Sequence, residues 1–203
     1  EIVLTGPRVG AYSYQGVRLP DLVRTVLAIP NLRRLRLSSL QPHELSPDLL
    51  ELWHDERLCP HVHMSLQSGS ATVLAKMQRR YTPDVFLSSM DALRAVSDRM
   101  AITTDVIVGF PGETEQAFAE TISFCRKARF SRIHVFPFSA RPGTVAAGMD
   151  GRVPAHVVKA RARMMSETAT FSRLFHERSC LASVREVLWE TETEAGSGLY
   201  SGT

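Results

Sequence analysis

The segment ITTDVIVGFPGETEQAF (residues 102–118) decides the fold of this chain. Residues 102–108 are rich in isoleucine, valine and threonine, which favours a β-strand, and Gly109 ends it. Thr114 begins a helix, and Glu115 lies near the positive end of that helix's dipole. The segment therefore predicts a strand, a glycine-rich loop and a helix, which together make one βα unit.

The alternation of strand and helix extends outward from this unit over residues 1–136. The other predicted strands are Ile2–Thr5, Arg34–Ser38, Val62–Leu66 and Ile133–Phe136. The other predicted helices are Leu19–Ile29, Pro47–Glu56, Ala71–Gln78 and Pro83–Asp98. Strands separated by helices indicate an α/β protein with a parallel sheet, either open or curved into a barrel. No Gly-x-Gly-x-x-Gly follows a strand, and polar clusters follow the strand ends, so a barrel is favoured over a dinucleotide-binding sheet.

The pattern changes after residue 150. A long basic helix is predicted at Pro154–Cys180, followed by a strand at Val184–Trp189 and a Gly/Ser-rich turn at Gly196–Gly202. We therefore expect a barrel part at 1–150, a connecting helix at 151–182 and the start of a small β domain at 183–203. Because a strand begins at once at the N-terminus, we also expect further sequence upstream.

Composition restricts the classes of function. The chain has 203 residues, of which 44% are hydrophobic and 22% charged, as in a folded globular protein. Its net charge of +3 permits a nucleic-acid partner without requiring one. No apolar run approaches the roughly 20 residues that cross a bilayer, so we expect no membrane partner. Cys59, Cys125 and Cys180 are too far apart for a disulfide framework or a cluster motif, which favours a reducing, cytoplasmic setting.

Four polar clusters follow the predicted strands. They are Ser38–Ser39, Ser65–Ser70, Asp105 with Gly109–Thr114, and Pro137–Thr144. Small hydroxyl residues and glycines let a ligand approach the backbone closely, although for any single loop turn chemistry is the favoured explanation. Four such loops on one rim predict a ligand site.

Three titratable side chains lie within these strands. Asp105 in an apolar strand must be hydrogen-bonded or paired, and a functional and a structural role remain equally open for it. His61 and His63 alternate along one strand and share a face, but no third ligand for zinc follows them. A structural role is therefore favoured for both histidines.

Several segments together carry a family resemblance. They are EIVLTG (1–6), RRLRLSSLQP (33–42), HVHMSLQSGSATVLAKMQRRYT (61–82), TTDVIVGFPGETEQAF (103–118) and RIHVFPFSARPGTVAAGM (132–149). In order and spacing they resemble the radical S-adenosylmethionine (SAM) methylthiotransferases. The last segment is most similar to the branch that modifies threonylcarbamoyladenosine in tRNA. The isopentenyladenosine branch and the branch that modifies a ribosomal-protein aspartate are close alternatives.

This resemblance implies an enzyme that adds a methylthio group to C2 of an anticodon-loop adenosine in tRNA. Such enzymes use SAM and two 4Fe–4S clusters, one of them in the barrel, where cleavage of SAM yields a radical that abstracts hydrogen from the substrate. The family's Cys-x-x-x-Cys-x-x-Cys loop belongs to the first barrel strand, and this chain lacks it. The resemblance therefore implies a partial (βα) radical-SAM barrel without its first βα unit, followed at 183–203 by the start of a TRAM-like domain. Alone, the polypeptide is expected to be inactive, and a non-catalytic nucleoside- or RNA-binding fragment stays an alternative.

The resemblance also implies a set of SAM-binding residues. Those expected to line the pocket are Ser38, Ser39, Gln67, Ser68, Arg79 and Asp105. Those expected to shape the adenosine loop and the far rim are Gly109, Pro111, Gly112, Phe138, Ser139 and Arg141. Arg79 would neutralise the SAM carboxylate, although it could equally be a surface charge. Pro7, Arg8 and Gln41 depart from the family pattern, which leaves the chemistry of the pocket open near them.

Overall fold

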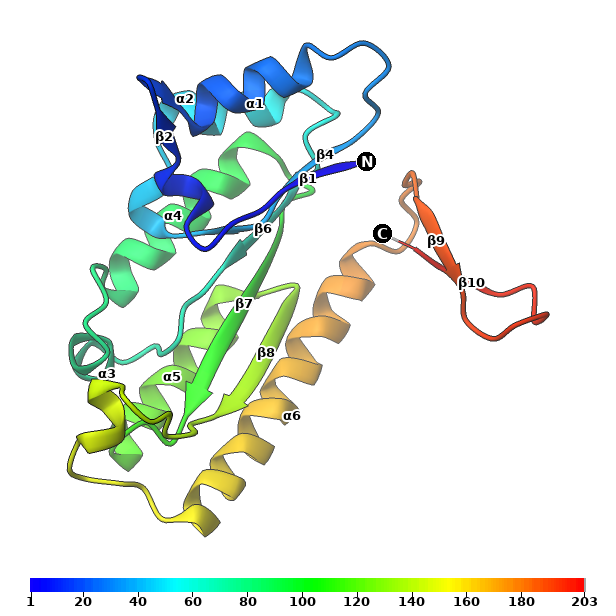
Figure 1. The fold of residues 1–203 in the computed structure, drawn as a ribbon. Coiled ribbons are helices and arrows are strands. Elements are labelled where there is room, and N and C mark those ends of the chain that lie inside the picture. Colours follow the sequence, from blue (N-terminus) through cyan, green and yellow to red (C-terminus); the bar gives the residue numbers. More distant parts are fainter. Residues whose placement is uncertain (203) are drawn as a thin grey trace.

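Parallel strands in sequential order form the centre of the fold in the computed structural model, which describes residues 1–202 (Figure 1). In spatial order the strands are β1 (Ile2–Leu4), β4 (Leu35–Leu37), β5 (Ser39–Leu40), β6 (His61–Met64), β7 (Ala101–Val108) and β8 (Arg132–Pro137). Only Ser38 separates β4 from β5, so this stretch of chain pairs with β1 on one side and β6 on the other. All of these pairings are parallel, as expected for successive βα units.

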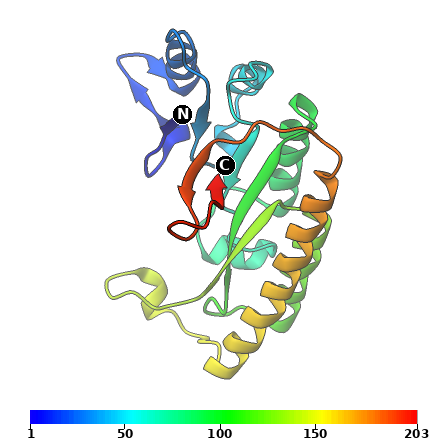
Figure 2. The ribbon, with the colours of Figure 1, turned by 90° about the vertical axis from the view of Figure 1, so that its right-hand side faces the viewer.

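The helices lie mainly on one face of this sheet. They are α1 (Leu19–Leu27), α2 (Pro47–Leu50), α3 (Ala71–Lys76), α4 (Pro83–Val96), α5 (Glu115–Ala128) and α6 (Ala155–Ser179). Figure 1 shows α4 and α5 behind the strands, and Figures 1 and 2 both show α6 alongside β8. No helix of residues 1–202 covers the opposite, concave face. Within the same residues no helix has the length and apolar character needed to span a membrane.

Strand β7 shows why the two faces differ. Its side chains alternate between fully buried and half-buried positions, because successive residues of a strand point to opposite faces. Ile102, Val106 and Val108 join the core under α4 and α5, whereas Thr103 and Asp105 face the concave side. The polar residues of this strand are therefore on the uncovered face, as in a barrel that keeps its site inside.

Short hairpins are where the structure departs from the sequence-based elements. The strand expected at Val184–Trp189 is wrong: residues 184–188 are not part of a strand, and β9 runs over Trp189–Glu192. It pairs with β10 (Tyr200–Gly202), which occupies the expected turn. A hairpin of β2 (Ser13–Tyr14) and β3 (Val17–Arg18) was not expected at all. Gln15 and Gly16 between them have φ of 47° and 82°, the positive values that a tight two-residue hairpin turn requires.

Short 3-10 turns replace or interrupt some helices. The helix expected at Pro47–Glu56 is α2 followed by η3 (Glu51–His54). The remaining 3-10 turns are η1 (Val9–Ala11), η2 (Pro42–Glu44) and η4 (Val145–Gly148). Two helices begin as their sequences suggest, because Thr82 and Thr114 accept hydrogen bonds from backbone amides of the first turns of α4 and α5. The sequence therefore locates the long elements well and the one-turn elements poorly.

Candidate functional site

A hydrogen-bonded cluster lies on the concave face of β6 and β7. Asp105 Oδ2 is 3.1 Å from His63 Nε2 and accepts a 3.2 Å hydrogen bond from Ser65 Oγ. His63 Nδ1 lies 2.9 Å from Thr103 Oγ1, its neighbour in the strand register. His134 of β8 is aligned with Asp105, and its ring centroid is 6.2 Å from that of His63. The parallel register thus gathers these groups from three strands.

The cluster holds Asp105 in its charged form. Burial raises the pKa of this carboxyl, but the hydrogen bond and charge of His63, with smaller contributions from Ser65 and His134, leave the pKa below its ordinary value. The side chain of Asp105 is 27% exposed, so a ligand on the concave face has access to it. Asp105 is therefore hydrogen-bonded by His63 and Ser65 and is still partly exposed on the concave face.

His61 precedes His63 by two residues in β6 and lies on the same face of the sheet. Its pKa falls from 6.5 to about 4, first because of burial and then because of the nearby Arg36 and His63. Its Nε2 lies 3.3 Å from Thr103 Oγ1, and its buried Nδ1 has no hydrogen-bond partner. His61 is therefore neutral at pH 7.

Several of the expected pocket residues meet at the same rim. Gln67 continues β6 beside β7: its amide donates to the Asp105 carbonyl over 2.8 Å, and Ile107 N donates back to Gln67 O. Ser39 is aligned with His63, and Ser38 precedes it with a buried hydroxyl that has no partner. The structure thus places Ser38 and Ser39 just after β4 and Gln67 just after β6, where Gln67 pairs with Asp105 and Ile107 within β7.

Two other expected residues are placed differently. Ser68 is fully buried and its hydroxyl lies 3.1 Å from Thr121 Oγ1 of α5, on the helix-covered side of the sheet. Arg79 follows α3 beside Tyr81, whose hydroxyl donates to the Ser65 carbonyl over 2.6 Å. The Nε atom of Arg79 is buried without a partner. Ser68 therefore contacts α5 on the covered side of the sheet, and Arg79 lies near Tyr81.

The loop after β7 is organised by a buried carboxylate that the sequence did not single out. Glu113 Oε2 accepts 2.7 Å hydrogen bonds from Gly109 N and from Arg161 Nη1 of α6. Arg161 also donates to the Glu113 carbonyl over 2.9 Å. Burial raises the pKa of Glu113, and the Gly109 amide and Arg161 oppose that rise. The side chain of Glu113 is 0% exposed, so these contacts fix the loop and α6 together.

The glycines of this loop serve packing and turns. Gly109 has φ of 78°, and a Cβ there would lie 2.5 Å from Val158 of α6. Gly112 has φ of 73°, and its amide donates to Gly151 O over 2.7 Å. Pro111 between them is buried. Gly109 and Gly112 thus lie against α6 and the segment before it, and the expected role of the three residues toward adenosine stays a prediction.

The far rim contains an aromatic pair. Phe138 is half-buried and packs edge-on against Phe110, with ring centroids 5.3 Å apart. Ser139 and Arg141 follow it in an exposed loop. Phe110 was not among the expected residues. The feature of the sequence that could have identified it is a large apolar side chain directly after Gly109, in a loop at the rim.

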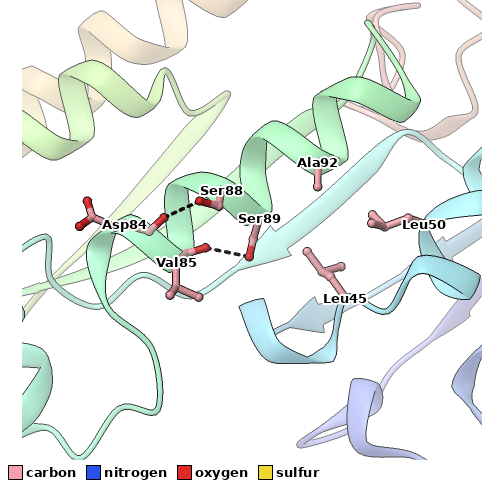
Figure 3. A pocket seen from close by; sticks show the side chains of 7 residues that line it. All are labelled: Leu45, Leu50, Asp84, Val85, Ser88, Ser89 and Ala92. Atoms are coloured by element: carbon pink, nitrogen blue, oxygen red, sulfur yellow. Dashed lines mark hydrogen bonds between the residues drawn. The ribbon is translucent and has the colours of Figure 1, made fainter.

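A groove also lies outside the concave face. It has a volume of about 350 Å³ and runs along the outer side of α4, between Val85 and Leu45 (Figure 3). The hydroxyls of Ser88 and Ser89 in its wall donate to carbonyls of their own helix, so they offer little to a ligand. We place the candidate site on the concave face, where Asp105 gathers polar partners from three strands.

Metal ligands do not gather in the part of the chain that the structure describes. No group of three or more His, Cys, Asp or Glu side chains there is arranged to hold a metal ion. Cys59 and Cys125 are buried, and burial raises the pKa of Cys125 to about 12. Cys125 is thus a core residue, as its apolar neighbours in the sequence indicated.

Comparison with known proteins supports the barrel architecture. The model of the radical SAM superfamily matches residues 2–125. Coproporphyrinogen III oxidase from Escherichia coli, a radical SAM enzyme, superposes with a TM-score of 0.55 at 20% identity, covering 68% of this chain and 31% of that one. This likeness shows the fold.

Two curated relatives are more similar in sequence. The threonylcarbamoyladenosine tRNA methylthiotransferase MtaB of Thermotoga maritima is 39% identical over 192 residues, which are 94% of this chain and 44% of that protein. A tRNA-2-methylthio-N(6)-dimethylallyladenosine synthase of Acetivibrio thermocellus is 35% identical over 206 residues, covering 100% of this chain and 43% of the relative. The chain thus spans less than half the length of either relative.

Replacing Arg161 tests the buried ion pair. Arg161→Met strands the Glu113 carboxylate, so we expect the free energy of unfolding to fall by about 3–5 kcal/mol. The double variant Glu113→Gln/Arg161→Met should lose less, because no buried charge is left. Urea denaturation measures both, and the exposed Arg163→Met on the same helix is the control, with an expected change within about 0.5 kcal/mol. Equal stability of the Arg161 and Arg163 variants would contradict the role of the pair.

His61 makes stability depend on pH. Between pH 6.5 and about 4 the unfolded chain binds a proton at His61 that the folded chain excludes, so stability falls as the pH falls through this window. The two pKa values correspond to a loss of about 3 kcal/mol. In His61→Gln this part of the pH dependence should disappear, whereas the exposed His156→Gln should keep the wild-type profile. Urea denaturation at a series of pH values measures the free energy of unfolding for each variant. If its pH dependence in His61→Gln is the same as in the wild type, the prediction is wrong.

Proposed function

The chain belongs to the radical SAM superfamily, and from that premise we propose that the protein is a methylthiotransferase that modifies adenosine in tRNA. The observation that carries the proposal is the identity of 39% and 35% with two tRNA methylthiotransferases over at least 94% of this chain. The polar cluster around Asp105 supports it, because it lies at the rim where barrels of parallel strands keep their sites.

For the substrate we propose C2 of N6-threonylcarbamoyladenosine in the anticodon loop of tRNA. The segment HVFPFSARPGT (134–144) favours this choice, and the Thermotoga relative has this nucleoside in its name. Dimethylallyladenosine is the second candidate, favoured by the Acetivibrio relative. A ribosomal-protein aspartate, or binding of a nucleoside or RNA without catalysis, remains as a further alternative. With a tRNA substrate, we propose a cytoplasmic location.

The concave rim fits SAM. This cofactor has hydroxyl and ammonium donors and a carboxylate acceptor, and the rim offers matching groups. Asp105 is a charged acceptor, and the hydroxyl of Ser38 is buried without a partner. We propose that these two residues, with Ser39 and Gln67, hold the cofactor, while Phe138 with Ser139 and Arg141 borders the adenosine end. When bound, SAM supplies the radical and the methyl group of such reactions.

Iron–sulfur clusters do not fit the residues of this chain. Its three cysteines are widely separated, and two of them are buried. The proposed enzyme therefore takes the ligands of its two 4Fe–4S clusters from outside these 203 residues. For the chain itself we propose three parts: a barrel part at 1–150, a connecting helix at 151–182, and the start of a TRAM-like domain at 183–203.

A substrate comparison tests the function. The full-length protein, with clusters reconstituted anaerobically, is incubated with SAM, a reductant and one of three substrates: tRNA with threonylcarbamoyladenosine, tRNA with dimethylallyladenosine, or the ribosomal protein. Mass spectrometry of the digested products should show a 2-methylthio group on threonylcarbamoyladenosine alone. Product on dimethylallyladenosine would establish the second candidate instead, and SAM turnover without product on any substrate would refute the proposal.

Asp105 is the residue whose removal should weaken SAM binding most. Asp105→Asn keeps the shape but loses a charge-assisted hydrogen bond worth about 1.5–3 kcal/mol, so we expect the dissociation constant of SAM to rise about 10- to 100-fold. Calorimetry on the reconstituted full-length protein measures the affinity. Asp91→Asn, an exposed carboxylate on α4, is the matched control and should bind like the wild type. Unchanged affinity in Asp105→Asn would assign that residue a purely structural role.

A further inference from the structure

One histidine of the concave face, His134, has a side chain that takes part in no hydrogen bond. It lies in β8, the last strand of the sheet, and is half-buried (Figure 1). Ile133 is buried and Val135 packs against the same core, so the alternation of the strand directs His134 to the concave face. Within residues 1–202 neither of its ring nitrogens has a hydrogen-bond partner. The imidazole therefore keeps its hydrogen-bonding groups for a ligand.

The other two histidines of this face differ from His134. His63 uses both ring nitrogens: Nδ1 lies 2.9 Å from Thr103 Oγ1, and Nε2 lies 3.1 Å from Asp105 Oδ2. His61 has its Nε2 3.3 Å from the same threonine hydroxyl, and its Nδ1 is buried. These two side chains belong to the internal structure of the cluster, whereas His134 is available to a bound molecule.

His134 lies beside the residue that we propose for the cofactor. The parallel register aligns it with Asp105, and its ring centroid is 6.2 Å from that of His63. Aligned residues of neighbouring strands are about 4.8 Å apart, so a molecule held at Asp105 has His134 next to it. A substrate must approach its cofactor closely in order to react. His134 therefore borders the space that a substrate and a cofactor at Asp105 would share.

The polarity around His134 separates the two candidate substrates. Its neighbours Asp105 and His63 are polar, and the apolar Phe136 of the same face lies nearer the end of the strand. The dimethylallyl group is a hydrocarbon, and against these side chains it would cover polar groups without giving them a partner, which is unfavourable. The threonylcarbamoyl group carries a urea, a hydroxyl and a carboxylate, all of which form hydrogen bonds. The surroundings of His134 thus suit the polar substituent.

Resting on the proposed function in tRNA modification, we propose that His134 determines which adenosine is modified. In this proposal its imidazole donates a hydrogen bond to an oxygen of the threonylcarbamoyl group. A site built to hydrogen-bond a substrate group discriminates strongly against an analogue that lacks the group, because the polar side chain is then left unpaired. His134 would therefore select threonylcarbamoyladenosine over dimethylallyladenosine without being needed to bind SAM.

Replacing the imidazole by a benzene ring tests this role. His134→Phe keeps an aromatic side chain in the strand and removes both ring nitrogens. In the full-length protein with reconstituted clusters, kcat/KM for tRNA with threonylcarbamoyladenosine should fall about 10- to 100-fold, as expected for the loss of a hydrogen bond to a polar or charged group. In a mixture of the two tRNAs, mass spectrometry should show the product ratio moving toward dimethylallyladenosine. The affinity for SAM, measured by calorimetry, should stay at the wild-type value.

Two further variants serve as controls. His156→Phe makes the same replacement at an exposed position in the first turn of α6 and should behave like the wild type in all three measurements. His134→Gln keeps an N–H donor and should retain more activity on threonylcarbamoyladenosine than His134→Phe does. Thermal unfolding followed by circular dichroism checks that all variants are folded.

The possible outcomes separate this inference from the proposed function. If His134→Phe modifies threonylcarbamoyladenosine as efficiently as His156→Phe, the inference is wrong although the proposed function stands. A loss of SAM affinity in His134→Phe would assign the residue to the cofactor, and equal losses on both tRNAs would assign it a general role; either result overturns the inference. A wild-type protein that modifies dimethylallyladenosine alone also overturns it. If the wild type modifies neither tRNA, the proposed function fails and the inference fails with it.

Discussion

The buried carboxylate of Glu113 is the contact on which the arrangement of the rim depends. It accepts hydrogen bonds from Gly109 at the end of β7 and from Arg161 in α6, so one side chain fixes a strand end, a loop and the longest helix. Its burial is unfavourable unless both partners are present, because a charge removed from water needs compensating donors. The turn that brings Glu113 back to Gly109 also directs Phe110 against Phe138. The rim is therefore specified by polar contacts beneath it.

The two faces of the sheet carry different side chains, apolar on the face that the helices cover and polar on the concave face. In β7 the even-numbered side chains form the core with α4 and α5, and the odd-numbered ones face the concave side. Ile102, Val106 and Val108 belong to the same buried apolar cluster as Phe86 and Phe124, whereas Asp105 meets His63. The parallel register then adds Ser65 and His134 without any loop being needed to position them. Strand geometry alone thus assembles a polar cluster that remains open to a ligand.

Patterns of local residues were enough to predict the helices and parallel strands, including the strand at Ile102–Val108, because burial fixes their periodicity. The strand at Val184–Trp189 was misplaced because a strand exists only where a partner pairs with it, and periodicity does not show the partner. In the site, Asp105 was found from its charge in an apolar strand. The position of Ser68 against α5 was not predicted, because it depends on the backbone of Gln67, whose φ of 66° turns the chain at this point. The Glu113–Arg161 pair joins residues 48 apart, a separation that no local pattern encodes.

Two polar regions near the strand ends carry opposite charges. Asp105 is held ionised on the concave face, while Arg8, Arg79 and Arg80 line one cavity between the segments that follow β1, β5 and α3. In the proposed function, the first region attracts the ammonium group of SAM and the second attracts its carboxylate. Charge placement therefore favours an orientation of the cofactor in which its carboxylate end lies toward the arginines.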